Sequence, residues 1–269
     1  MAKRTRARLL TFGRRPEADL RASGIVSSAW PDRLSVEVAY RGEIVLVETK
    51  LVGEHWIPSV LAGIAIGLVS GVDLKTCAQI VKSVEPVFSR CSVHSRPDDA
   101  AYVLDAFKAP YWTIAEGLAF VRKALAPRKT IVLGTISDYP GSASPRYRRV
   151  ARDALEVADR VIFVGPHAAH IDKLLRQGVG KDRLFGFQTA YQASAFICGD
   201  EIAGELIYIK GSVVDHLERI MLARLDEVVC WKERCGRKRS CADCSKYRMA
   251  ASPSFGLAHS DGSAPRVSV

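Results

Sequence analysis

The sequence has no apolar run of the roughly 20 residues that a membrane-spanning helix needs. Its longest candidate, residues 57–70, is too short and contains small residues that suit close helix packing. Residues 1–15 are basic but include no apolar segment, so they do not form a secretory signal. These absences predict a cytoplasmic protein without a membrane span.

Glycine-rich loops for nucleotide phosphates are also missing. A P-loop places glycines, a lysine and a serine or threonine ahead of a helix, where backbone amides hold the phosphates. Its nearest counterpart, residues 178–182, reads Gly-Val-Gly-Lys-Asp, which has the wrong spacing and follows a helical pattern. The Rossmann pattern Gly-x-Gly-x-x-Gly is absent as well. We therefore expect no ATP turnover from this sequence alone.

Positive charge is concentrated at two places. The formal net charge is +10, from 39 Lys and Arg against 29 Asp and Glu. Six of the positive residues lie within residues 3–15 and seven within residues 232–248, so the stretch between them is close to neutral. A nucleic-acid-binding face should lie on the folded body. We therefore do not expect nucleic acid as a partner, and any such role would belong to the second basic stretch.

Residues 85–226 alternate between short apolar runs and helical patterns. The apolar runs predict strands at residues 101–107, 130–133, 161–164, 184–187 and 206–209. The helical patterns predict helices at residues 110–126, 147–158, 167–177 and 213–225. Strands separated by helices of this length form βαβ units with right-handed crossovers. The sequence therefore predicts an α/β domain with a Rossmann-like, mostly parallel sheet covered on both faces.

The segments on either side of that domain have different sequence patterns. Residues 1–84 predict a small α+β region, with strands at 9–12, 34–39 and 43–52 and helices at 57–68 and 74–84. The first helix is almost entirely apolar, so we expect it to be buried on most sides. Residues 249–269 are rich in Ser, Ala, Gly and Pro, which predicts disorder.

Five short motifs carry a family resemblance. In chain order they are Gly53-Glu54-His55, Pro86 to Arg90, Asp105-Ala106-Phe107-Lys108-Ala109-Pro110, Ile131-Val132-Leu133-Gly134 and Ile209-Lys210-Gly211-Ser212. Their order and surroundings resemble the end of the central domain and the C-terminal domain of Mur ligases. Among these the UDP-N-acetylmuramoyl-tripeptide–D-alanyl-D-alanine ligases of peptidoglycan biosynthesis are the most similar. The likeness covers residues 8–225.

The resemblance implies an activity for the whole enzyme. Mur ligases join a carboxylate to an amine at the expense of ATP, with Mg²⁺, through an acyl phosphate. Residues 1–84 would be a remnant of the central domain, and residues 85–226 the C-terminal domain. That domain would bind the incoming amino acid or peptide and close over the nucleotide, and a missing N-terminal ATPase portion would be its partner.

The resemblance also implies residues that bind substrate or nucleotide, although it assigns no catalytic residue. These are Arg90, Asp105, Lys108, Lys210, Gly211, Ser212 and His55. The sequence departs from the family at Trp56, Ser59 and Lys108, which replace asparagines, and at Val213, which replaces an arginine. Those amides help to hold nucleotide in the family, so their loss bears on ATP binding in the familiar geometry.

The strand-end residues support the same assignment on physical grounds. Ligands of open parallel sheets bind beyond the carboxyl ends of the strands, where Asp105 and Lys210 are expected. Ser212 and Asp215 have the spacing of a capping box, so a helix start beside Lys210 would attract a phosphate or carboxylate. The same Ser-x-x-Asp pattern also caps helices that bind nothing, and this alternative stays open.

Cysteine is present in an odd number, seven, which argues against a disulfide framework. Four of the seven lie within residues 227–248 in the pattern Cys230-x4-Cys235-x5-Cys241-x2-Cys244. Four thiolates suit tetrahedral Zn²⁺, and the surrounding Lys and Arg would offset their charge. An iron–sulfur cluster uses the same number of ligands. The remaining alternative is a free, redox-sensitive tail.

Three functions therefore stand at this point. The first is the C-terminal portion of a Mur-type ligase with a small-molecule or peptidyl substrate. The second is a non-catalytic binding protein descended from such a ligase, with a metal-stapled basic tail. The third is a small-molecule enzyme that uses the α/β domain alone, for which no nucleophile or cofactor loop is recognisable.

Overall fold

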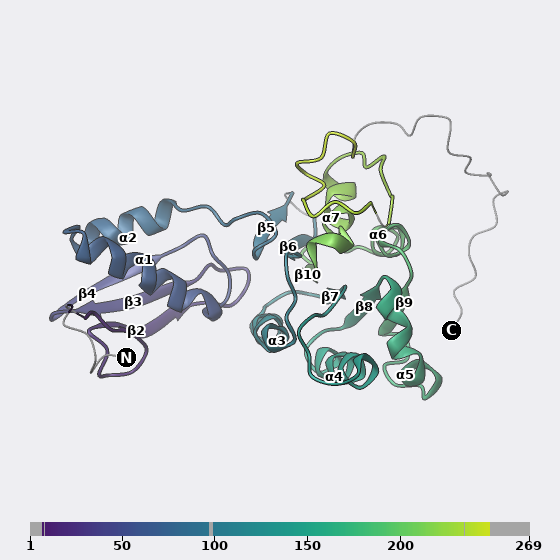
Figure 1. The fold of residues 1–269 in the computed structure, drawn as a ribbon, viewed down its shortest axis with the longest axis horizontal. Helices are drawn as coiled ribbons and strands as arrows, with labels where there is room; N and C mark the ends of the chain where they lie inside the picture. The colour runs from purple at the N-terminus through teal and green to yellow at the C-terminus, as the bar shows by residue number, and fades with distance from the viewer. Residues whose placement is uncertain (1–6, 8, 97–98, 234, 248–269) are drawn as a thin grey trace. The chain divides into compact units, whose positions relative to one another are not determined.

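The structure, a computed structural model, describes residues 7, 9–96, 99–233 and 235–247. The disorder expected for residues 249–269 lies outside these described residues. The chain divides into two compact units, residues 1–92 with 119–126 and residues 93–118 with 127–269 (Figure 1). None of the described helices is long and apolar enough to cross a membrane.

The first unit is a four-stranded sheet with two helices. The sheet has the order β1 (Phe12–Gly13), β2 (Leu20–Ser27), β3 (Ser35–Tyr40) and β4 (Glu43–Glu48). β2, β3 and β4 are antiparallel neighbours, and β1 runs parallel to β2. After the 3-10 turn η2 (Glu54–Trp56) come α1 (Ile57–Val69) and α2 (Leu74–Ser83), whose N-cap is Asp73.

The core of the first unit lies between the sheet and these two helices. Alternate residues of β3, among them Val36 and Val38, are fully buried against Leu61 and Ile64 of α1. The expectation that α1 is buried on most sides was wrong. Its other face is open, and Ile66 is 66% exposed, because only one stripe of the helix faces the sheet.

The second unit is a six-stranded sheet with the order β5-β6-β10-β7-β8-β9, and the predicted α/β class with a mostly parallel sheet is confirmed. Its strands are β5 (Ser92–Ser95), β6 (Ala101–Asp105), β7 (Lys129–Leu133), β8 (Arg160–Val164), β9 (Leu184–Phe187) and β10 (Leu206–Lys210). The five strands from β6 onward are parallel and correspond to the five predicted apolar runs. β6, β7, β8 and β10 are buried over most of their length, as expected of strands covered on both faces, whereas only Leu184 of the edge strand β9 is buried.

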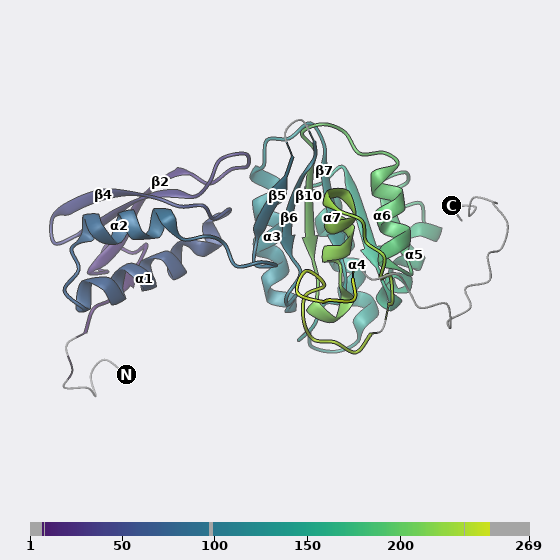
Figure 2. The ribbon, with the colours of Figure 1, turned by 90° about the horizontal axis from the view of Figure 1, so that it is seen from above.

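Helices cover both faces of this sheet. The helices are α3 (Ile114–Lys123), α4 (Ala143–Leu155), α5 (Asp172–Arg176), α6 (Ala190–Cys198) and α7 (Glu218–Leu225). The 3-10 helices η3 (Tyr111–Thr113) and η4 (Pro166–Ile171) precede α3 and α5. Figures 1 and 2 show α3 and α4 on one face and α6 and α7 on the other. Because β10 lies between β6 and β7, the chain leaves β7 and β10 toward opposite faces, which makes their carboxyl ends a topological switch point.

The helix predicted for residues 213–225 was wrong as a single element. A 3-10 turn, η5 (Val213–Asp215), comes first, and α7 begins only at Glu218. His216 between them has left-handed backbone angles, with φ of 51°. A left-handed residue cannot continue a right-handed helix, so it separates the two.

A glycine on α3 allows a close approach to the sheet. A Cβ added to Gly117 would lie 2.8 Å from ring atoms of Tyr208, whose side chain is only 2% exposed. We expect Gly117→Ala to lower the free energy of unfolding by about 1–3 kcal/mol through overpacking. The matched control is Gly63→Ala on α1, where the new Cβ meets nothing within 4 Å. It should raise stability by about 0.5–1 kcal/mol, and urea denaturation followed by circular dichroism would show the opposite signs.

Candidate functional site at the carboxyl ends of the parallel strands

The structure brings Asp105 and Lys210 together at the carboxyl ends of β6 and β10. The two residues are register partners on neighbouring parallel strands. Lys210 Nζ lies 2.5 Å from Asp105 Oδ2, and the Tyr208 hydroxyl donates to the same oxygen at 3.0 Å. Lys210 is only 4% exposed, so its charge is balanced inside the protein by this carboxylate. The pair is a preorganised ammonium at a strand end, suited to an anionic group.

Asp215 joins the ends of β7 and β10. Its carboxylate accepts hydrogen bonds from the backbone N–H of Thr135 at 2.8 Å and of Ser212 at 2.9 Å. The Thr135 hydroxyl donates to its other oxygen at 2.7 Å. Ser212 and Asp215, which have the spacing of a capping box in the sequence, therefore close a turn at the switch point. In this arrangement the Ser212 amide is bonded to Asp215.

Two glycines leave room for this carboxylate. A Cβ on Gly134 would lie 2.5 Å from Asp215 Oδ2 and 2.8 Å from Leu217 Cδ1. A Cβ on Gly211 would lie 3.0 Å from the same oxygen. Gly134 and Gly211 belong to two of the sequence motifs and directly follow β7 and β10. Their missing side chains let Asp215 sit directly over the strand ends.

The other predicted site residues are more scattered. Lys108 is exposed beyond the end of β6, and Ser212 is half-buried. Arg90 and His55 belong to the first unit. There His55 Nε2 lies 3.5 Å from the sulfur of Cys91, which is buried. The assignment of all these residues to substrate or nucleotide remains a prediction.

A cavity of about 430 Å³ opens at the carboxyl ends of β7, β8 and β9. It is lined by Thr135, Val164, Gly165, Pro166, Gln188, Thr189, Ala190, Val214, Asp215, Leu217, Arg219, Glu233 and Gly236. Its wall carries both signs of charge. Arg219 is positively charged, and Asp215 and Glu233 are negatively charged. Such a wall suits a small polar ligand that itself carries both charges.

Most residues that line this cavity were not predicted from the sequence, although two local features lie at its wall. Gly165 and Pro166 follow β8 directly, and Gly165 has a positive φ of 93° that turns the chain sharply there. Thr189 and Gln192 form a capping box at the start of α6, a helix absent from the prediction. Both signals place polar backbone at strand ends, where parallel sheets bind ligands.

Arg219 connects the cavity to the Cys-rich segment, defined here as residues 227–247. Its guanidinium donates to the carbonyl oxygens of His216 at 3.2 Å and Cys230 at 3.0 Å, and it lies over the Trp231 ring. The side chain is only 1% exposed. The Cys-rich segment is therefore packed against the domain, and its residues Glu233 and Gly236 form part of the cavity wall.

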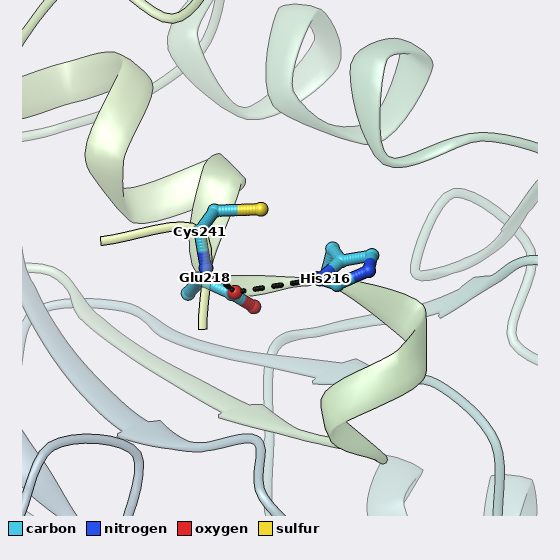
Figure 3. A group of neighbouring side chains, drawn as sticks. All are labelled: His216, Glu218 and Cys241. Carbon is cyan, nitrogen blue, oxygen red and sulfur yellow. Dashed lines mark hydrogen bonds and ion pairs between the residues drawn. The ribbon is translucent and has the colours of Figure 1, made fainter. Parts of the chain in front are cut away.

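A second cavity, of about 240 Å³, lies within the Cys-rich segment. All four predicted cysteines line it, and so does His216 from the turn before α7. Ligand atoms of His216, Glu218 and Cys241 lie within 4.8 Å of one another (Figure 3). Burial, and then the nearby Glu218 carboxylate, raises the pKa of the Cys241 thiol to about 12.

Comparisons with known proteins bear on these sites. No protein-family model matches the chain. A curated relative, the UDP-N-acetylmuramoyl-L-alanyl-D-glutamate–2,6-diaminopimelate ligase of Geobacillus kaustophilus, is 28% identical over 174 residues, which is 64% of this chain and 34% of the relative. A second ligase of that description, from Clostridium acetobutylicum, is 31% identical over 100 residues, 37% of this chain and 20% of that protein. The chain spans about a third or less of these two relatives.

Solved structures give the same picture of the fold. The UDP-N-acetylmuramoylalanyl-D-glutamyl-2,6-diaminopimelate–D-alanyl-D-alanyl ligase of Acinetobacter baumannii matches with a TM-score of 0.67 at 19% identity, over 81% of this chain and 46% of that one. The MurF ligase of Thermotoga maritima, solved in complex with ADP, matches with a TM-score of 0.63 at 15% identity, over 79% of this chain and 47% of that one. These relatives and structural neighbours are Mur ligases, so the resemblance read from the sequence is confirmed.

Proposed function

We propose that this relative of the Mur ligases supplies the C-terminal portion of an ATP-dependent, amide-bond-forming ligase. In this role it binds the incoming amino acid or peptide and closes over the nucleotide. The observation that carries the proposal is the cavity at the carboxyl ends of β7–β9, whose wall presents both signs of charge. The proposal also places the protein in the cytoplasm, where the nucleotide is available.

The charges of that wall match the chemistry of an amino acid. A free amino acid is a zwitterion, so its carboxylate needs a cation and its ammonium group needs an anion. Arg219 supplies the cation from the buried floor of the cavity, and Asp215 and Glu233 supply carboxylates. Guanidinium–carboxylate contacts are both strong and directional, which would fix the orientation of the incoming amine.

The Asp105–Lys210 pair has a different role in this proposal. A lysine ammonium has three donors, and Asp105 holds one of them in place. Its remaining donors would meet an anion, the phosphate of an activated substrate or nucleotide. With a single carboxylate already paired to a lysine, the pair does not suit Mg²⁺, which prefers several hard oxygen ligands. In this proposal any Mg²⁺ would belong with the nucleotide on an ATPase portion.

The binding test uses the full chain and the amine substrates that the relatives' names give. Isothermal titration calorimetry with 2,6-diaminopimelate and with D-alanyl-D-alanine should show saturable binding of one of them. Glu233→Gln should weaken it about five-fold, which corresponds to roughly 1 kcal/mol for a rim charge. Glu227→Gln is the matched control, because Glu227 is also exposed in the same segment but does not line the cavity.

The result that would overturn the proposal is equally concrete. If neither compound binds at millimolar concentration, the cavity does not hold the incoming amine. Equal weakening by both glutamine variants would also count against it, because the effect would then come from net charge alone. ATP hydrolysis by the pure chain is expected to be absent, and measurable turnover would contradict the assignment of the ATPase to another portion.

A further inference from the structure

Five side chains of types that bind metals line the second cavity. Cys230, Cys235, Cys241 and Cys244 come from the Cys-rich segment, and His216 comes from the left-handed turn before α7. His216 is more than 20 residues away from Cys241 and Cys244 in the sequence, so spacing alone does not associate it with the cysteines. The cavity therefore contains one more candidate ligand than the tetrahedral Zn²⁺ site needs.

His216 is the member that points to a bound ion. Its side chain is 2% exposed, and its Nε2 lies 3.0 Å from the Cys235 sulfur. Its Nδ1 is buried and has no hydrogen-bond partner among the described residues. A buried imidazole with so little hydrogen bonding is costly, because its polar atoms have lost water. A metal ion bound at Nε2 would fix the ring proton on Nδ1, which lies on the side of the Glu218 carboxylate.

Glu218 is placed to orient this imidazole. Its carboxylate is buried, and Oε1 lies 3.6 Å from His216 Nδ1 (Figure 3). The same oxygen accepts a hydrogen bond from the backbone N–H of Cys241 at 2.7 Å. A carboxylate beside one ring nitrogen keeps the proton there and leaves the other nitrogen for a metal. Glu218 thus links the histidine and the cysteine that would share the ion.

The surroundings of the cavity carry the charge that thiolates require. Lys232, Arg237, Arg239 and Lys246 line it, and the Arg237 guanidinium lies 3.7 Å from the Cys244 sulfur. Three thiolates and one neutral histidine around Zn²⁺ leave one net negative charge, which these cations offset.

We propose that this cavity is a structural Zn²⁺ centre with His216 Nε2, Cys235, Cys241 and Cys244 as its ligands. Cys241 and Cys244 have the Cys-x-x-Cys spacing of zinc knuckles, and the Cys244 N–H already bonds to the Cys241 carbonyl. Each thiol loses its proton to solvent as it binds. The mixed histidine and cysteine set favours Zn²⁺ over a four-cysteine iron–sulfur cluster.

The centre would also fix one wall of the ligand cavity. Glu233 and Gly236, which line that cavity, flank the ligand Cys235 in the sequence. The ion would anchor this stretch to His216 at the start of α7, so the wall would hold its shape only when the metal is bound. This inference goes beyond the proposed function, because a structural zinc would be present whichever amine the cavity accepts.

The first experiment is elemental analysis of the purified full chain. We expect one Zn²⁺ per chain and no iron. His216→Asn should lower Zn²⁺ affinity by more than about 100-fold, because it removes a direct ligand. Asparagine tolerates left-handed backbone angles, so the turn should persist. Cys198→Ser is the matched control, since Cys198 is exposed on α6 outside the cavity, and it should keep full occupancy.

A second set of variants keeps the proposal testable if His216→Asn does not fold. Glu218→Gln should weaken Zn²⁺ binding about 10- to 100-fold as an outer partner of the histidine. Cys230→Ser should retain the metal, whereas Cys244→Ser should lose it. When cobalt replaces zinc, the protein should show a thiolate-to-cobalt charge-transfer band. Of these two cysteine variants, only Cys244→Ser should weaken that band. Absence of bound zinc, or full occupancy in both His216→Asn and Glu218→Gln, would overturn the assignment.

Discussion

Glu205→Ala lowers the free energy of unfolding of the second unit by about 3–5 kcal/mol, the cost of removing one partner from a buried ion pair. Glu205 is fully buried at the amino-terminal edge of the sheet. Its carboxylate pairs with Arg128 at 2.6 Å and Arg160 at 2.9 Å and accepts from the Thr130 hydroxyl. Arg160 is itself 5% exposed, so the variant would leave a buried cation without its main counter-ion.

The control for Glu205→Ala is Asp200→Ala. Asp200 pairs with the same two arginines, but its side chain is 62% exposed, so we expect a cost below about 1 kcal/mol. Hydrogen exchange of the amides in β7, β8 and β10 would measure the stability of this unit by itself. A loss below 1 kcal/mol for Glu205→Ala would mean that water replaces the carboxylate.

Asp215→Ala lowers the stability of the second unit by about 3 kcal/mol, because two backbone amides lose their charged acceptor and a buried donor left unsatisfied costs about 1–3 kcal/mol. The amides of Thr135 and Ser212 lose their acceptor. Since Asp215 also lines the ligand cavity, amine binding should fall at the same time. Asp153→Ala, which removes an exposed helical ion pair with Arg149, should cost less than about 0.5 kcal/mol.

A double-mutant cycle tests whether the absence of a side chain at Gly134 makes room for the Asp215 carboxylate. In the native chain the added Cβ of Gly134→Ala would meet Asp215 Oδ2 at 2.5 Å. Once Asp215 is alanine, part of that clash disappears, so Gly134→Ala should cost less in the double variant. The remaining cost would come from Leu217 Cδ1 at 2.8 Å. Strict additivity of the two changes would contradict the close approach.

Much of the fold could be predicted from the sequence, because most strands of the parallel sheet are buried on both faces. Runs such as residues 161–164 are apolar throughout, which is typical of strands within a covered parallel sheet. Helix α6 escaped prediction because its buried stripe, Ala190, Ala193, Ser194 and Ile197, has helical spacing but small side chains. β2 escaped because bulges interrupt its register, so its apolar residues do not alternate.

Site residues could be predicted from the sequence only where a motif lies at the end of a strand. Asp105 and Lys210 were expected at strand ends, and the sheet order makes them neighbours. The cavity beside them depends on which strands lie next to each other, and nothing local in the sequence specifies that β10 enters between β6 and β7. His216 could not be associated with the cysteines for a similar reason, because its position depends on a left-handed turn that interrupts an otherwise helical pattern.

The central position of β10 has a consequence for the order in which the protein is made. Its residues pair with β6 and β7, which leave the ribosome about a hundred and about eighty residues earlier. Until β10 emerges, the nascent sheet consists of two halves whose facing edges lack their shared partner strand. Exposed strand edges are templates for association with other chains. A ribosome that stalls before residue 206 would therefore release an aggregation-prone fragment, and the pairing of β10 is the step that joins the two halves of the sheet.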